Sequence, residues 1–153
     1  MTTLTTAAPA RTVVRDSTRT DLRDPVQQAF WLLRIGFTVA PILFGLDKFA
    51  HVLVNWDKYL APEFTDLFNT SAHTLMYAVG AIEIVAGLVV AVRPRFGGYL
   101  VAAWLAGIIV NLLLIGGYYD IALRDFGLLL AALTLARLAT AVTPPARVTR
   151  SDG

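Results

Sequence analysis

The 153-residue sequence contains no cysteine. This absence excludes disulfide frameworks, thiol relays, cysteine-ligated iron–sulfur clusters and cysteine zinc sites. Any redox role would therefore need a bound cofactor or a partner protein. Only two histidines are present, His51 and His73, and they lie on different segments without a ligand-spacing motif. We therefore predict no metal site, and a site completed by Asp47 or Glu63 is the weaker alternative.

The sequence also lacks a phosphate-binding loop, a dinucleotide fingerprint and a Ser-His-Asp set, because its glycines occur singly or in pairs within apolar runs. Its net charge is only +2. The arginines lie at the chain ends and in short connections beside apolar runs, where membrane topology accounts for them. We therefore expect neither a nucleic-acid partner nor a soluble cofactor.

Apolar residues make up 56% of the chain, and the mean hydropathy of +0.62 is well above what a soluble fold of this size needs. A bilayer core of about 30 Å needs about 20 mostly apolar residues per helix. Four such runs are present, at 30–53, 72–92, 99–119 and 121–142. The predicted fold is an all-α integral membrane four-helix bundle with short connections, one of which is a turn over 93–98.

The transmembrane domain is expected over residues 26–142, between two tails. Residues 1–25 are rich in Thr, Ala and Arg and lack the apolar core of a secretory signal. Together with residues 143–153 they are expected to be disordered cytoplasmic segments.

Basic residues predict the orientation of the four spans. Three separate clusters fall on one side of the membrane, and this side is cytoplasmic by the positive-inside rule. The clusters comprise Arg11, Arg15, Arg19, Arg23 and Arg34, then Arg93 and Arg95, then Arg137, Arg147 and Arg150. We therefore expect a multi-pass protein of a bacterial cytoplasmic membrane with both termini in the cytoplasm.

The outer connection between the first two spans is not a plain loop. Trp56, Leu60, Phe64 and Leu67 recur at three- to four-residue spacing, as in a segment that lies in the headgroup region. Pro62 limits this segment to short helical pieces. An aromatic belt that anchors the bundle and a lid over a lipid-facing site are the two interpretations.

Polar residues inside the spans concentrate in the outer half of the bundle. A charge at the centre of a span costs about 3 kcal/mol, so such residues usually face the protein interior and pair. Glu83 shares a helix face with Gly80, and Asn111 shares one with Ala103 and Gly107; small residues mark the approach of a neighbouring helix. The six candidate ligand-binding residues are Asp47, Lys48, Glu83, Asn111, Arg124 and Asp125.

Two interpretations of this cluster remain open. In the structural one, Glu83 pairs with Lys48 or Arg124, and Asp125 pairs with the other, purely to hold the helices together. In the functional one, the cluster binds a polar headgroup such as a quinone ring, with Glu83 or Asp125 taking a proton and Lys48 or Arg124 donating to a carbonyl oxygen. A small transporter is less favoured, because the inner half is almost wholly apolar.

Several short motifs resemble the DoxX family of small four-helix membrane proteins. They are Arg34-Ile35-Gly36 in the first span, Gly45-Leu46-Asp47-Lys48-Phe49 at its outer end, Glu83 followed by Gly87, and Arg124-Asp125. The resemblance covers about residues 30–138. It implies a subunit or accessory of a quinone-linked redox complex, with a quinone as a non-covalent ligand and either a membrane protein partner or a second copy beside it. It assigns no reaction, and the missing cysteines exclude the thiol chemistry of similar four-helix families.

Overall fold

The computed structural model describes residues 24–142, which form helices and contain no strand. The elements are α1 (Pro25–Ala50), the 3₁₀ helix η1 (Trp56–Tyr59), α2 (Pro62–Phe68), α3 (Ala72–Val92), α4 (Pro94–Ile115) and α5 (Tyr119–Val142). Residues 1–23 and 143–153, which hold nearly all of the two predicted disordered segments, lie outside the described residues.

Four of these helices are long and apolar enough to cross a membrane: α1, α3, α4 and α5. Each also exposes large apolar side chains along its length, such as Ile35, Val85, Leu113 and Leu130, which are 49–57% exposed. Such extended apolar surface is unfavourable in water and suits contact with lipid. The all-α membrane helical bundle predicted from the sequence is therefore confirmed.

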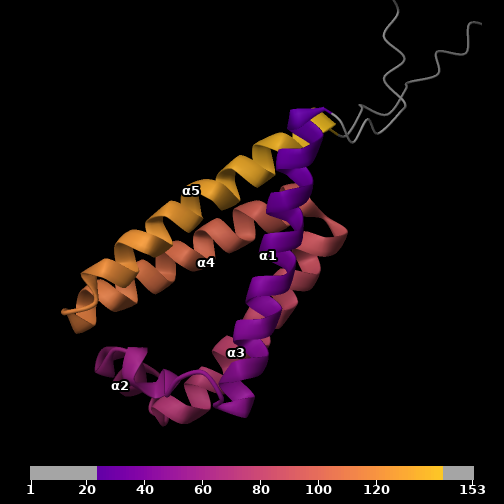
Figure 1. Ribbon diagram of the computed structural model, residues 1–153. Helices are drawn as coiled ribbons and strands as arrows, with labels where there is room; N and C mark the ends of the chain where they lie inside the picture. Colours follow the sequence, from indigo (N-terminus) through magenta and orange to yellow (C-terminus); the bar gives the residue numbers. More distant parts are fainter. Residues whose placement is uncertain (1–23, 143–153) are drawn as a thin grey trace, which may run out of the picture.

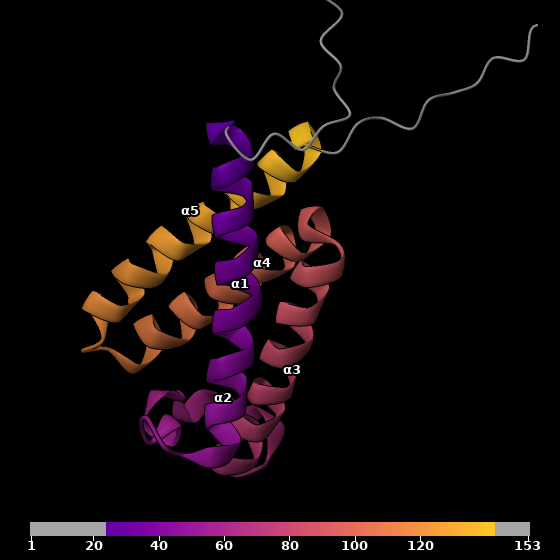
Figure 2. The same ribbon diagram turned by 45° about the vertical axis from the view of Figure 1, so that its right-hand side comes forward.

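The four long helices form two antiparallel pairs (Figures 1 and 2). Helix α1 packs along α3, and α4 packs along α5. The pairs approach each other near the start of α1 and the end of α5, which we call the terminal end. They diverge towards the opposite end, where α1 ends and α3 begins, and which we call the loop end.

The apolar core lies towards the terminal end. It is built from the first half of α1, the last turns of α3, the first half of α4 and the second half of α5. Its buried members include Phe30, Phe37, Val90, Leu105 and Leu135. The half of the bundle next to the loop end contributes few residues to this core. Other side chains therefore fill the interior of that half.

The connection between α1 and α3 spans residues 51–71 and contains η1 and α2. Pro62 is the first residue of α2, as expected from its fixed φ angle and missing N–H. The prediction of short helical pieces in this connection is therefore confirmed.

The predicted turn over 93–98 is wrong. Helix α3 ends at Val92, and α4 already begins at Pro94, leaving Arg93 as the single connecting residue. Gly97 and Gly98 lie within α4, where α3 and α5 of the same chain approach them closely. A Cβ atom on Gly97 would lie 2.5 Å from Val90 Cα, and one on Gly98 would lie 2.8 Å from the Ala132 carbonyl oxygen. The glycine pair permits packing of α4 instead of a turn.

The real turn between the last two spans lies at Gly116 and Gly117. Both have positive φ angles, of 73° and 82°, which only glycine adopts readily. Helix α4 therefore stops at Ile115, four residues before the expected end of the third span.

Candidate functional site

Four charged residues are buried among the described residues: Asp47, Lys48, Glu83 and Asp125, each less than 9% exposed. They come from α1, α3 and α5, and all belong to the predicted candidate set. Buried charges are costly in a membrane helix unless they are paired, so their partners define what the cluster does.

Lys48 and Glu83 form an ion pair between α1 and α3. The Lys48 Nζ atom donates to Glu83 Oε2 at 2.6 Å, and the two side chains are 4% and 10% exposed. This is one of the two pairings foreseen for Glu83. Because the pair is almost completely removed from solvent, neither partner can lose the other without leaving a buried charge.

Trp56 of η1 lies over this ion pair. The Lys48 Nζ atom is 3.9 Å from the centroid of the Trp56 ring, within range for a cation–π interaction. The connection between α1 and α3 therefore contacts the ammonium group through Trp56.

The Glu83 carboxylate also interacts with Trp104 of α4 and, electrostatically, with Asp125 of α5. The Trp104 indole Nε1 is buried and has no regular hydrogen-bond partner among the described residues. It lies beside the Glu83 carboxylate. All four membrane-spanning helices thus contribute to the surroundings of one carboxylate.

Asp125 and Arg124 are adjacent in the sequence and paired. Arg124 Nη2 lies 2.9 Å from Asp125 Oδ1, and Arg124 Nε donates to the same oxygen at 3.0 Å. The Asp125 side chain is 6% exposed, whereas that of Arg124 is 66% exposed. The guanidinium group therefore reaches the surface while it neutralises a buried carboxylate. With Lys48 paired to Glu83, Arg124 is the predicted partner of Asp125.

Asp47 holds the start of the α1–α3 connection. Its Oδ1 atom accepts hydrogen bonds from the backbone N–H groups of Val52 and Leu53, at 3.1 and 3.0 Å. Its Oδ2 atom accepts the indole N–H of Trp56 at 2.6 Å. The carboxylate is thus used to fix the loop, and it places Trp56 against Lys48.

Asn111 of α4 holds the other side of the same connection. Its Oδ1 atom accepts the Ala61 backbone N–H at 2.9 Å, and its Nδ2 atom donates to the Tyr59 carbonyl oxygen at 2.6 Å. Asn111 therefore meets protein, as predicted. The predicted helix neighbour is wrong, because Ala103 and Gly107 are exposed and nothing lies within 4 Å of a Cβ atom added at Gly107. The partner of Asn111 is the connection between α1 and α3.

Arg34 lies near the terminal end of α1, where its guanidinium donates to the Ala91 carbonyl oxygen and lies 4.8 Å from the Trp31 ring centroid. Ala91 belongs to the last turn of α3, whose carbonyls have no partner within the helix. Arg34 therefore joins α1 to the end of α3, away from the polar cluster.

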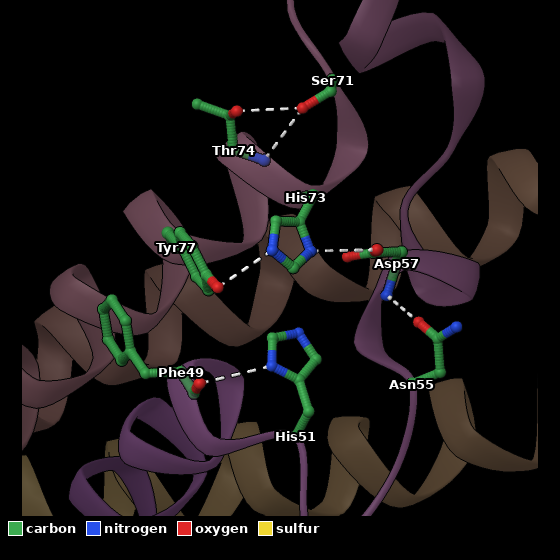
Figure 3. Close-up of polar contacts among 8 residues, drawn as sticks. All are labelled: Phe49, His51, Asn55, Asp57, Ser71, His73, Thr74 and Tyr77. Atoms are coloured by element: carbon green, nitrogen blue, oxygen red, sulfur yellow. Dashed lines mark hydrogen bonds and ion pairs between the residues drawn. The ribbon is translucent and has the colours of Figure 1, made fainter.

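The two histidines lie together at the loop end. The rings of His51 and His73 are stacked with centroids 5.0 Å apart, and His73 Nδ1 lies 3.3 Å from Asp57 Oδ2 (Figure 3). The carboxylate beside His73 is thus Asp57, which the sequence did not suggest. Trp56 and Trp104 were missed as well, because an aromatic residue in an apolar run gives no signal of a charged neighbour.

The predicted residues thus fall into two groups. Lys48, Glu83 and Asp125 form a buried charged cluster with the Trp104 indole, and the exposed Arg124 belongs to it as the partner of Asp125. Asp47 and Asn111 fix the α1–α3 connection. Comparisons with protein-family models, with curated proteins and with solved structures found no match. The resemblance to the DoxX family therefore stays a prediction from the sequence motifs.

Proposed function

We propose that this chain is a DoxX-like subunit or accessory of a quinone-linked redox complex in a bacterial cytoplasmic membrane, with both termini in the cytoplasm. The loop end then faces outwards, and the polar cluster lies in the outer half of the bundle. The cluster formed by Lys48, Glu83, Trp104 and Asp125 is the proposed site for a polar headgroup of the quinone class.

The observation that carries this proposal is the environment of Glu83. One buried carboxylate is surrounded by an ammonium group, a buried indole N–H without a regular hydrogen bond, and a second buried carboxylate. A quinone ring presents two carbonyl oxygens that accept hydrogen bonds and that take up protons on reduction. Lys48 and Trp104 supply donors for such an oxygen, and Glu83 supplies a group that exchanges protons.

Glu83 and Asp125 lie on different helix pairs, Glu83 on α1/α3 and Asp125 on α4/α5. A headgroup bound at the cluster would therefore contact both pairs. Its apolar tail would remain against the exposed apolar side chains of the spans.

A second function is favoured by a specific observation. Both carboxylates of the proposed site already have a cationic partner, Lys48 for Glu83 and Arg124 for Asp125. These pairs are the ones expected of a purely structural or assembly subunit, whose charges hold the helices in register. Such a protein would bind no headgroup, although its stability would still depend on Glu83.

The test is purification of the full chain from its native membrane in a mild detergent, by a C-terminal affinity tag without histidine. Co-purifying proteins are identified by mass spectrometry, and quinone is extracted and quantified. We expect a stoichiometric oxidoreductase partner, and quinone that is retained by the wild type and lost from Glu83→Gln. Glu63→Gln, an exposed carboxylate change on α2, is the matched control.

A wild-type protein that emerges with neither partner nor quinone contradicts the proposal. Equal quinone content in the wild type and in a folded Glu83→Gln variant also contradicts it, because the quinone would then be associated with the detergent micelle. Either result favours the structural function.

A further inference from the structure

His51, Asp57 and His73 come together at the loop end from three different segments (Figure 3). His51 follows the last residue of α1, Asp57 lies in η1, and His73 lies in the first turn of α3. One ligand atom from each of the three lies within 4.8 Å of the other two. This cluster is separate from the buried charged cluster, and the proposed function does not use it.

The histidines are oriented by their other ring nitrogens. His51 Nδ1 lies 3.3 Å from the Phe49 carbonyl oxygen, and His73 Nε2 lies 2.9 Å from the Tyr77 hydroxyl oxygen. The remaining nitrogen of His51 is turned towards His73 and Asp57 in Figure 3. Metal-bound histidines usually have this arrangement, in which the outer nitrogen bonds a carbonyl or hydroxyl group and the inner lone pair faces the ion.

The spacing also fits one metal ion. Ligand bonds of about 2.0–2.2 Å place two ligand atoms of a tetrahedral site about 3.3–3.5 Å apart. His73 Nδ1 and Asp57 Oδ2 are already separated by 3.3 Å. His51 needs a shift on the order of 1 Å to complete the set, and its side chain is exposed.

We propose that His51, Asp57 and His73 bind one divalent transition-metal ion of the zinc class. Two imidazoles and one carboxylate favour such an ion over Mg²⁺ and Ca²⁺, which prefer oxygen ligands. The exposure of both histidines leaves room for water to complete the coordination. An ion bound here joins the end of α1, η1 and the start of α3, and thus fixes the connection that carries Trp56.

The backbone at the ligands is suited to this role. His51 adopts the left-handed conformation with φ 53°, and its N–H donates to the Asp47 carbonyl oxygen at 2.7 Å. The Asn55 side chain accepts the Asp57 N–H at 3.1 Å. Both segments are thus held by hydrogen bonds that do not involve the three ligand atoms.

The test uses the full chain in detergent, purified without a polyhistidine tag and treated with a chelator. Binding of ZnCl₂ is measured by calorimetry, and CoCl₂ is added as a spectroscopic probe for visible d–d absorption. The variants are His51→Asn, Asp57→Asn and His73→Gln, and asparagine is chosen at 51 because it tolerates a positive φ angle. Glu63→Gln, which removes the carboxylate favoured from the sequence, is the matched control.

We expect the wild type and Glu63→Gln to bind one equivalent of zinc. With cobalt, both should show visible d–d absorption that is lost when the histidines are replaced. Each ligand variant should bind zinc at least about tenfold more weakly, since even an outer-shell change typically costs about 10- to 100-fold. Tyr77→Phe should cause a smaller loss through the orientation of His73. Zinc should raise the unfolding temperature of the wild type and leave that of the His51→Asn/His73→Gln variant unchanged.

Two results would overturn the proposal. One is a wild type that binds zinc and cobalt no more tightly than the double histidine variant. The three residues would then interact only through the His73–Asp57 contact and the stacked histidine rings. The other is zinc binding that survives in all three ligand variants, which would place the ion elsewhere. The chain has only these two histidines and no cysteine, so the double variant has no imidazole or thiolate ligand left.

Discussion

Gly45 of α1 and Gly80 of α3 lie so close together that neither position has room for a side chain. A Cβ atom on Gly45 would lie 2.6 Å from the Gly80 carbonyl oxygen, and one on Gly80 would lie 2.8 Å from the Gly45 carbonyl oxygen. The two backbones therefore touch. The contact lies one turn from Lys48 and Glu83, and it brings α1 and α3 close enough for their ion pair.

Replacement of Gly45 by alanine should push the two helices apart. Because the obstacle is backbone and cannot rotate away, we expect a loss of about 1–3 kcal/mol in the free energy of unfolding. Gly36→Ala is the matched control on the same helix, since nothing lies within 4 Å of the added Cβ. It should be neutral or more stable by up to about 1 kcal/mol. Thermal unfolding in detergent compares them, and equal losses would contradict the close contact.

Loss of one partner of the Lys48–Glu83 pair should be strongly destabilising. We expect Lys48→Met and Glu83→Leu each to cost up to about 3–5 kcal/mol, because the remaining member of the pair stays buried as an unpaired charge. The double variant Lys48→Met/Glu83→Leu should regain most of this loss. Denaturant unfolding of the four proteins gives the coupling energy, and additive losses would show that the pair is not coupled.

Asn111 should control the position of the α1–α3 connection. Asn111→Ala leaves the Ala61 N–H and the Tyr59 carbonyl without their partners, at a cost of about 1–3 kcal/mol. Hydrogen exchange should rise over residues 59–68 and stay unchanged in the terminal half of the bundle. Leu113→Ala, a change at an exposed site on the same helix, is the control. Unchanged exchange in Asn111→Ala would contradict this role.

The proposed orientation can be measured because the chain has no cysteine of its own. A single cysteine at Ser71, near the loop end, should react with a membrane-impermeant maleimide added to intact cells. A single cysteine at Arg95, near the start of α4, should react only after the membrane is opened. The opposite pattern would place the termini outside.

The sequence was sufficient to predict the number of long helices, since four apolar runs of about 20 residues have few alternatives in a membrane. It was misleading at the two glycine pairs. Gly97-Gly98 and Gly116-Gly117 look alike in the sequence, yet only the second pair is a turn. The difference arises from tertiary contacts of Gly97 and Gly98, which local patterns do not contain.

The candidate site could be predicted only in part, again because local sequence patterns do not contain tertiary contacts. A charge within an apolar run signals a buried partner, so Lys48 or Arg124 was predicted to pair with Glu83. The structure shows that the partner is Lys48. The sequence could not predict that Trp56 covers this pair, or that Asp57 lies beside His73. Both depend on how the connection between α1 and α3 folds back, which Asp47 and Asn111 determine through hydrogen bonds to its backbone and to Trp56.

The central claim is that the cluster around Glu83 binds a quinone headgroup, and titration of the purified protein with a short-chain benzoquinone tests it most directly. Trp56 and Trp104 lie beside the cluster, so their fluorescence reports binding. We expect saturable quenching in the wild type and in Glu63→Gln, and at least about tenfold weaker binding in a folded Glu83→Gln variant, as for the loss of a charged hydrogen bond. Linear, unsaturable quenching in the wild type, or equal affinity in Glu83→Gln, would contradict the claim.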